Sequence, residues 1–304
     1  MISAVVPTWN RADLLRRALC SLEGADEVIV VDNGSTEPLD IGRARLLRLD
    51  RNYGFAYAVN RGLEVARGDW VAVINNDVVL APGYLEELRA TGADFSTGLI
   101  LQEGAPDRVD AAFDLLTRGG LACRVGQGRP AAEFQTEREI QFAPWTAVLL
   151  RRAVLDRVGL LDESFESYME DVEFGLRCGL AGIRGRFVPR AQAFHRGSAT
   201  LGPWHPETVR RLSRNQLLLT AKHFPRDWIW QAGCSLVLGQ IWWGLNAVRR
   251  GCGSAWWQGK REGWRAWRTR RPSHQAPWAV LRASERQLQQ CAVGWFWKVN
   301  AWMI

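Results

Sequence analysis

Apolar and polar residues alternate in blocks through the first hundred positions, and each block has the length of one strand or one helix. Short runs of apolar β-formers predict strands at 2–7, 27–32, 45–49 and 70–74. Between them, apolar spacing predicts helices over 11–22, with Asn10 as a capping residue, and over 56–66, with Asn60 and Arg61 exposed. Strand and helix in alternation predict an α/β fold whose parallel strands are joined by right-handed crossovers.

Polar residues follow three of these strands directly. Thr8, Asp32 and Asp77 come at or just after strand ends, which share one edge in a parallel sheet, so we expect them to converge on one crevice. Each has an ordinary structural explanation as well. Asp32-Asn-Gly-Ser35 suits an Asx-turn, and Asp77 could cap a helix beginning near Pro82 instead of binding a metal ion.

The second hundred residues are less regular. A strand is predicted at 95–101, followed by loops over the sheet to about residue 139. A helix is expected within 147–158 and another from about residue 169, with a buried stripe made of Met169, Val172, Leu176 and Leu180. Two short strands should follow, at 184–189 and 191–195.

Two features of this region carry candidate chemistry. The second helix opens with the acids Glu170, Asp171 and Glu173, which could either compensate the helix dipole or act on a substrate. His195 ends the last strand, where it could be a structural histidine or a ligand.

The chain from residue 204 onward has a different composition. After a helix at 204–223, residues 228–248 carry no charge, and they could form an interfacial helix, a membrane span or a core or dimer helix. Residues 254–271 predict a basic amphipathic helix with Trp256, Lys260, Trp264 and Trp267 on one face, which suits a lipid headgroup layer.

Charge and aromatic content support a membrane surface as the partner of this region. The formal net charge is +7, and residues 249–304 hold eleven Arg and Lys against two acids. Twelve of the sixteen tryptophans lie beyond residue 227, which favours a membrane interface over nucleic acid. The six cysteines form no CxxC pair, and the N-terminus does not have the pattern of a signal peptide, so we expect a reducing cytosolic environment.

Several enzyme classes lose support from missing motifs. No GxGxxG follows the first strand and no GxxxxGK[ST] occurs, which disfavours dinucleotide oxidoreductases and P-loop enzymes. The Gly-rich, lysine-bearing start of nucleotidyltransferases is also missing.

Four motifs in order resemble those of family 2 inverting glycosyltransferases, most of all the bacterial rhamnosyltransferase-like branch. They are Val5-Val-Pro-Thr-Trp-Asn-Arg11, Val31-Asp-Asn-Gly-Ser35, Asn52-Tyr-Gly-Phe55 with Asn60-Arg-Gly62, and Ile74-Asn-Asn-Asp77. The Glu170-Asp171 pair and His195 also match, whereas Glu173 stands where the family often has Asp. The resemblance implies a GT-A (Rossmann-like), mostly parallel sheet flanked by helices over residues 1–203, with a nucleotide-sugar half at 1–98 and an acceptor and catalytic half at 99–203. Residues 204–304 would then be a helical, membrane-associating extension.

The resemblance also implies residue roles. Asp171 would be the general base, with Glu170 as the alternative, and Asp77 with His195 would bind Mn²⁺ or Mg²⁺, the histidine favouring Mn²⁺. Thr8 and Asp32 would hold nucleobase and ribose, Asn76 would lie near the ribose, and Trp145 and Thr146 would lie on the acceptor side. The donor-binding set comprises Pro7, Thr8, Asn10, Arg11, Asp32, Asn33, Ser35, Asn52, Gly54, Asn60, Asn75 and Asn76.

The sequence thus predicts a metal-dependent inverting glycosyltransferase that builds a cell-envelope glycan on a lipid-linked acceptor. Asn75-Asn-Asp77 resembles deoxysugar transferases, which favours dTDP-rhamnose over a UDP- or GDP-sugar. A non-catalytic nucleotide-sugar-binding scaffold is the alternative. We expect a peripheral protein on the cytoplasmic face of the bacterial inner membrane that contacts the membrane through residues 224–271. It would bind no nucleic acid and could form a homo-oligomer.

Overall fold

The computed structural model describes residues 1–197, 204–225, 227, 230–269, 276–291 and 294–303. Its strands are β1 Ile2–Thr8, β2 Glu27–Asp32, β3 Arg45–Arg48, β4 Trp70–Ile74, β5 Val78–Leu80, β6 Phe95–Gln102, β7 Ala105–Ala111, β8 Asp114–Leu116, β9 Ala122–Arg124, β10 Arg138–Ile140, β11 Ala147–Arg151 and β12 Gly185–His195. Its α-helices are α1 Ala12–Cys20, α2 Phe55–Val65, α3 Tyr84–Ala90, α4 Arg152–Val158, α5 Glu170–Leu180, α6 Pro206–His223, α7 Gly233–Arg249, α8 Gly253–Thr269, α9 Trp278–Gln290 and α10 Trp295–Met303. Short 3₁₀ turns lie at Ala131–Glu133 and Glu163–Phe165.

The chain forms two compact units. The first comprises residues 1–114 and 126–197, and the second comprises residues 115–125 and 198–304. The hairpin segment 115–125, which we expected among the loops of the acceptor half, therefore clusters with the helical part of the chain. Residues 198–203 lie outside the described residues, so the expected boundary at 203/204 stays a prediction.

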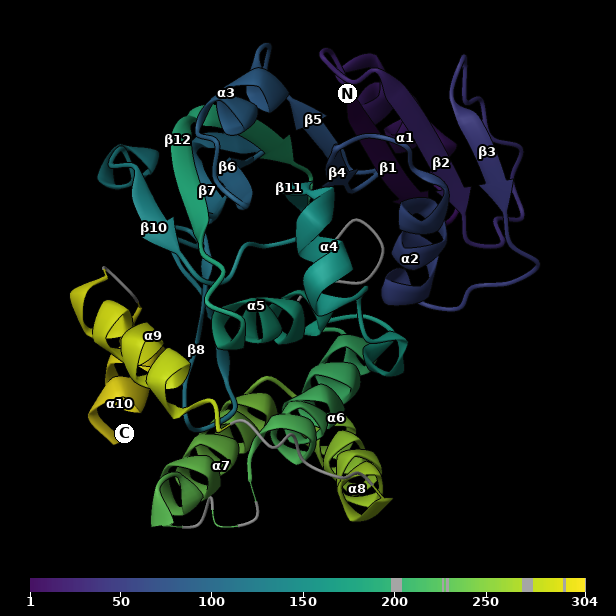
Figure 1. Ribbon diagram of the computed structural model, residues 1–304. Coiled ribbons are helices and arrows are strands. Elements are labelled where there is room, and N and C mark those ends of the chain that lie inside the picture. The colour runs from purple at the N-terminus through teal and green to yellow at the C-terminus, as the bar shows by residue number, and fades with distance from the viewer. Residues whose placement is uncertain (198–203, 226, 228–229, 270–275, 292–293, 304) are drawn as a thin grey trace. The chain divides into compact units, whose positions relative to one another are not determined.

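A large sheet forms the core of the first unit, with strands in the order β10-β12-β6-β11-β4-β1-β2-β3 (Figure 1). The predicted strands at 2–7, 27–32, 45–49 and 70–74 are confirmed as β1, β2, β3 and β4, and their mutual pairings are parallel. Every residue of β1 and β4 is buried, as an apolar run in the centre of such a sheet requires. Helix α2 packs against β1 and β2, and α3 packs against β6 and β12.

The second half of the sheet is mixed and differs from the prediction. Residues 147–151 form strand β11, antiparallel to both β4 and β6, and the helix α4 begins only at Arg152. An apolar run of this length suits a buried strand or a buried helix equally well, and pairing on both sides decided for the strand. The segment expected as loops to residue 139 contains β7, β8, β9 and β10. The two strands expected at 184–195 are one strand, β12, with an irregularity between Val188 and Gln192.

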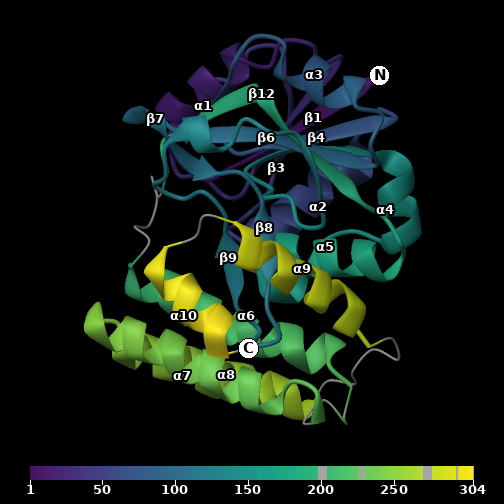
Figure 2. The ribbon, with the colours of Figure 1, turned by 90° about the vertical axis from the view of Figure 1, so that its left-hand side faces the viewer.

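The second unit contains the helices α6 to α10 and the small β8–β9 sheet (Figure 2). Helix α8 packs closely along α6 because Gly259 and Gly263 face the α6 backbone. A Cβ at Gly259 would lie 2.2 Å from the Arg210 carbonyl oxygen, and one at Gly263 would lie 2.8 Å from that of Arg214.

Lys260 overturns the face predicted for the basic helix. Its side chain is buried, and Nζ donates to the Ser213 carbonyl at 2.9 Å, to Gln216 Oε1 at 2.7 Å and to Gln240 Oε1. Burial lowers the pKa of Lys260 well below 10.5. The face of α8 with Trp256 and Lys260 therefore packs within the unit, and the exposed face of α8 carries Trp257 and Trp264 instead.

Helix α7 turns an apolar stripe outward. Its buried residues include Leu236, Gly239, Gly244 and Ala247, whereas Val237, Leu238, Ile241, Leu245 and Val248 are exposed. Among the described residues, no helix has both the length and the hydropathy of a membrane span.

Candidate active site

The ends of β1, β2 and β4 meet at one sheet edge, as predicted. Thr8 pairs with Asp32 in the sheet register, and Thr8 Oγ1 accepts a hydrogen bond from Asn76 Nδ2 at 2.8 Å. The next residue in the chain is Asp77. The edge therefore brings a hydroxyl, an amide and two carboxylate-bearing positions into one neighbourhood.

Asp32 closes the polar turn that follows β2. Its Oδ1 accepts from the Ser35 backbone N–H at 2.8 Å, its side chain is fully buried, and its Oδ2 lies 3.5 Å from Arg48 Nε. The Asx-turn is therefore present. The contact of this carboxylate with a nucleobase or ribose stays a prediction.

Asn10 does not cap α1. The capping position is Arg11, which makes no side-chain capping bond, and both residues adopt left-handed backbone conformations. Asn10 instead ties this segment to the polar turn, because its backbone N–H donates to Ser35 Oγ at 2.7 Å and its Oδ1 accepts from the Thr36 N–H at 3.0 Å. Pro7 precedes this segment as the penultimate residue of β1.

The predicted donor residues Asn33, Asn52 and Gly54 form a network with one another. Asn33 Nδ2 donates to Asn52 Oδ1 at 3.1 Å and to the Gly54 carbonyl at 3.0 Å. At Gly54, φ is +92° and a Cβ would lie 2.8 Å from the Glu166 carbonyl oxygen. The first N–H groups of α2 are also occupied, since Phe55 donates to Ser167 Oγ and Ala56 to the Glu166 carbonyl. This network therefore fixes the loop that precedes Glu170 and Asp171.

Asn60 is buried, so its predicted exposure is wrong. Its Oδ1 accepts from the Leu161 N–H at 3.0 Å, and its Nδ2 donates to the Leu161 carbonyl at 2.9 Å and to Glu163 Oε1 at 3.0 Å. Arg61 also bonds to Glu163, at 2.9 Å. The Asn60 amide therefore holds the 161–163 segment through hydrogen bonds. This structural role could not be predicted from the position of Asn60 on a helix.

His195 lies between two carboxylates. Its Nε2 is 3.3 Å from Asp77 Oδ2 and its Nδ1 is 2.8 Å from Asp110 Oδ2, with all three side chains at most 14% exposed. Burial alone would lower the pKa of His195, but the hydrogen bonds to Asp110 and Asp77 outweigh it and raise this pKa from 6.5 to about 9. Asp77 does not cap α3, because Gly83 holds the capping position without a side-chain bond. The capping explanation is thereby excluded.

Asp77 and His195 have the spacing of two ligands of one divalent cation. Adjacent ligands of an octahedral ion with bonds of about 2.1 Å are about 3 Å apart, and these two atoms are 3.3 Å apart. The described residues contain no group of three or more His, Cys, Asp or Glu arranged for a metal. Mg²⁺ is commonly held by one or two carboxylates while substrate phosphates complete its shell, so Asp77 with His195 beside it fits the expected ion.

Asp171 is the second residue of α5, which follows a strained loop. Glu166, Tyr168 and Met169 all have positive φ, between +59° and +74°. Such strain clusters where surrounding structure holds a functional segment in place. Glu170 is buried, whereas Asp171 is half-buried, so Asp171 is the more accessible of the two candidate bases.

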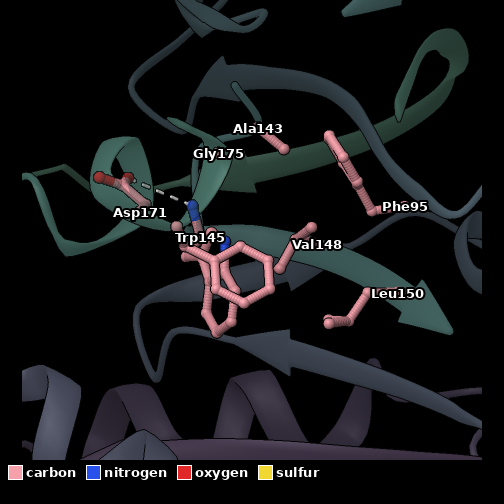
Figure 3. Close-up of a pocket in the computed structure, with 8 residues that line it drawn as sticks. Phe95, Ala143, Trp145, Val148, Leu150, Asp171 and Gly175 are labelled. Carbon is pink, nitrogen blue, oxygen red and sulfur yellow. Dashed lines mark hydrogen bonds between the residues drawn. The ribbon is translucent and has the colours of Figure 1, made fainter. Parts of the chain in front are cut away.

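A small, mostly apolar pocket lies beside Asp171. Figure 3 shows the Asp171 carboxylate at one end of the lining, next to the Trp145 backbone, whose N–H is 3.5 Å from Asp171 Oδ2. The pocket has about 230 Å³ of empty space, part of it open solvent, and is lined by Phe95, Ala143, Trp145, Val148, Leu150, Asp171, Phe174 and Gly175.

Backbone hydrogen bonds connect this pocket to the metal side of the site. The Asn75 N–H donates to the Thr146 carbonyl at 3.0 Å, so the end of β4 adjoins the 145–146 segment. Trp145 and Thr146 are both buried, at 4% and 6% exposure. Their acceptor-side role stays a prediction.

Two residues with clear roles in this geometry were missed in the sequence. Asp110 lies in the segment expected as loops, and the available signal was an acid between the small apolar residues Val109 and Ala111. Glu173 was predicted only as one of the acids that open the helix and as a departure from the family pattern, and its buried ion pair was not predicted. It is fully buried and binds Arg177, one turn further along α5, with both carboxylate oxygens.

Comparison with known proteins agrees with the motifs. The model for "Glycosyl transferase family 2" matches residues 3–159. An N-acetylglucosaminyl-diphospho-decaprenol L-rhamnosyltransferase of Mycobacterium tuberculosis is 29% identical over 239 residues, which cover 66% of this chain and 78% of that protein. A pre-mycofactocin glycosyltransferase of the same organism is 30% identical and is aligned over 67% of this chain and 44% of its own length.

Solved structures share the fold. GalNAc-T7 with UDP, GalNAc and Mn²⁺ gives a TM-score of 0.60 at 15% identity, covering 79% of this chain and 51% of that one. The mannosyltransferase PcManGT from Pyrobaculum calidifontis, with GDP-Man and Mn²⁺, gives 0.51 at 16% identity over 99% of this chain and 83% of that one. The fold is accordingly that of the GT-A glycosyltransferases, with a C-terminal helical extension.

Proposed function

Because the chain belongs to glycosyl transferase family 2, we propose that it moves a sugar from a nucleoside diphosphate to an acceptor hydroxyl with inversion at the anomeric carbon. The observation that carries the proposal is the sheet edge itself, where Asp77 and His195 lie 3.3 Å apart and adjoin, through Asn75 and Thr146, the segment beside Asp171.

Asp171 is the proposed general base. Its carboxylate takes the proton of the acceptor hydroxyl while that oxygen forms a bond to the anomeric carbon and the bond to the diphosphate breaks on the opposite face. This single displacement inverts the anomeric centre. Glu170 remains the alternative base, although its burial makes it less suited to meet an acceptor.

Asp77 and His195 would hold a divalent cation, Mn²⁺ or Mg²⁺. When bound, such an ion supplies positive charge against the charge that the departing diphosphate develops. The fit of the two side chains to one ion and the Mn²⁺ bound in two solved structures of this fold support this assignment.

The proposed donor is dTDP-rhamnose. Support comes from the Asn75-Asn76-Asp77 sequence and from a 29% identical relative named as an L-rhamnosyltransferase. Thr8 and Asp32 would contact the nucleobase and ribose, with Asn76 near the ribose. The same relative's name supports a polyprenyl diphosphate-linked glycan as acceptor and cell-envelope polysaccharide as product.

A lipid-linked acceptor suits a protein that binds a membrane surface, and the second unit offers a face for it. Helix α7 exposes Ile241 and Leu245 among its aliphatic residues, and α8 exposes Trp257 and Trp264. Arg261, Arg265 and Arg268 are exposed on α8 as well. Apolar and aromatic side chains beside arginines complement an anionic bilayer, and we assign this face to the cytoplasmic leaflet of the inner membrane.

Transfer assays with point variants test the mechanism. UDP-, dTDP- and GDP-sugars with Mn²⁺ are first screened by thermal shift, and the stabilising donor is then used with N-acetylglucosaminyl-diphospho-prenol as acceptor. Asp171→Asn should lose about 10²- to 10⁴-fold in kcat while still binding donor nucleotide, and Asp77→Ala should lose transfer. Asp156→Asn, at an exposed acid on α4, is the control and should transfer normally.

The assay separates the alternatives. Near-normal turnover by either Asp171→Asn or Asp77→Ala would contradict the proposed mechanism. A protein that binds a nucleotide-sugar but transfers with no donor would support the non-catalytic scaffold instead.

A further inference from the structure

Both ring nitrogens of His195 are engaged, and each faces a different carboxylate. Nε2 faces Asp77 at 3.3 Å and Nδ1 faces Asp110 at 2.8 Å. Asp77 belongs to the sheet edge that the donor site uses. Asp110 comes from β7, which pairs with β6 and not with the strand of His195.

A β-bulge aims Asp110 at the histidine. In the β6–β7 pairing, Ile100 lies opposite Ala111 and Leu101 opposite Val109, so Asp110 is the extra residue between two paired positions. A bulge turns one side chain away from the regular alternation and is often found next to active sites. Here it lets a carboxylate from β7 reach the end of β12, although β6 lies between the two strands.

We infer that Asp110 is a positioning residue that presents Nε2 of His195 to the donor-bound cation. The inference rests on the proposed function. A carboxylate that accepts the Nδ1–H proton fixes the tautomer and the ring plane, and it leaves the Nε2 lone pair directed at the Asp77 side. Such partners commonly change metal affinity by about 10- to 100-fold when they are removed.

A purely structural role for Asp110 makes a different prediction. If Asp110 only stabilised the fold as a buried ion pair, its loss would lower unfolding stability and leave the cation affinity of the folded protein unchanged. The positioning role places the effect on cation affinity and on the tautomer of His195.

Cation binding tests the inference without a transfer assay. Mn²⁺ is titrated into full-length protein with saturating dTDP, or with UDP, and free Mn²⁺ is followed by electron paramagnetic resonance. Asp110→Ala should weaken Mn²⁺ binding by about 10- to 100-fold. Asp110→Asn should lose less, because its amide oxygen can still accept the Nδ1–H proton. Asp107→Asn, an exposed acid on the same strand, should bind Mn²⁺ like the wild type.

Nitrogen NMR provides a second readout. The chain has four histidines, so His195→Gln assigns the His195 signals in ¹⁵N-histidine-labelled protein. At alkaline pH, where the ring is neutral, the wild type should carry its proton on Nδ1, and Asp110→Ala should populate the Nε2–H tautomer. This readout also serves if Asp110→Ala proves unstable, because Asp110→Asn should retain the Nδ1–H tautomer.

The outcomes keep the two proposals apart. If Asp77→Ala and His195→Ala abolish Mn²⁺ binding but Asp110→Ala stays within twofold of wild type with an unchanged tautomer, the positioning role is wrong and the metal site stands. If Mn²⁺ binding survives Asp77→Ala and His195→Ala, the metal assignment in the proposed function fails instead.

Discussion

Asp171 and Glu173 lie two residues apart in the first turn of α5, and their surroundings suit them to different roles. Asp171 is half-buried beside the apolar pocket, whereas Glu173 is fully buried against Arg177. Arg177 also donates to the carbonyls of Val158 and Leu160, so the pair fastens α5 to the segment after α4. Removing one partner of a buried ion pair leaves the other charge uncompensated.

Glu173→Gln should therefore destabilise the fold and spare the chemistry. We expect a loss of about 3–5 kcal/mol in the free energy of unfolding, measured by urea titration, with kcat of the folded fraction close to wild type. Asp171→Asn, on the same helix, should show the opposite pattern, with stability nearly unchanged and kcat lost. A stable but inactive Glu173→Gln protein would contradict this division.

Among the helices, the contact between α8 and α6 depends on the absence of side chains. Gly259 faces the Arg210 carbonyl at a distance where no Cβ fits, and Gly263 does the same at Arg214 one turn later. Alanine is normally better than glycine inside a helix, by about 1 kcal/mol. At Gly259 and Gly263 the close approach of α6 should make alanine less stable than glycine.

Gly259→Ala should destabilise the second unit in spite of its higher helix propensity. We expect a loss of about 1–3 kcal/mol, because α8 must shift away from α6 to admit the methyl group. Urea titration measures the loss. Gly294→Ala, at a position with no heavy atom within 4 Å of the added carbon, is the control and should show none of this cost. Equal stability of the two variants would mean that the helices do not pack as closely as described.

The first turn of α6 carries a pH-dependent contribution to stability. Hydrogen bonds from Arg210 and Arg211 to Glu207 outweigh burial and lower the pKa of Glu207 from 4.5 to about 2. A carboxyl group whose pKa is lower in the folded state stabilises that state above its unfolded pKa of 4.5. That contribution disappears as the pH falls through about 2.

Glu207→Gln should thus lower the thermal unfolding midpoint at pH 7 by an amount that stays constant down to pH 5. Below pH 4.5 the difference from wild type should shrink, and near pH 2 it should vanish. Glu23→Gln, at an exposed residue of the first unit, should track the wild type throughout. A deficit independent of pH would assign the effect to lost packing instead of charge.

At the scale of the whole molecule, the second unit combines two segments that are distant in the chain, so a truncation would disrupt its packing. Residues 115–125 belong to this unit, and α9 holds them in place. Arg118 pairs with Glu285 at 2.9 Å, and the Leu116 N–H donates to Ser284 Oγ at 2.7 Å. Truncation after His223 would remove α9, and with it the partners of Leu116 and Arg118. Point variants on the surface are the better probe of membrane binding.

Variants of the exposed face of α8 should reduce binding to anionic liposomes. Replacing Arg261, Arg265 and Arg268 by Gln should weaken co-sedimentation roughly 100-fold, at about 1 kcal/mol per basic residue, and should do so only with anionic lipid. Trp257→Ala with Trp264→Ala should weaken binding to anionic and neutral vesicles alike. Trp9→Ala, an exposed tryptophan of the first unit, is the control. Wild-type co-sedimentation by both sets of variants would overturn the membrane face.

The amino-acid sequence by itself determined the N-terminal half of the sheet and the identity of most candidate site residues. A strand buried on both faces needs an unbroken apolar run, so β1 and β4 can be predicted from the local sequence. The polar residues at their ends lie at one sheet edge because the strands are parallel. Thr8, Asp32 and Asp77 could be grouped for that reason alone.

Only the tertiary structure decided the features that depend on a partner distant in the chain. Residues 147–151 became a strand because β4 and β6 bond to both edges, which an apolar run does not specify. Asn60 and Lys260 turned inward because Leu161 and the neighbouring helices offered hydrogen-bond partners. Asp110 meets His195 through a bulge in a strand pairing, and since register between strands is a long-range property, no local pattern could have predicted that contact.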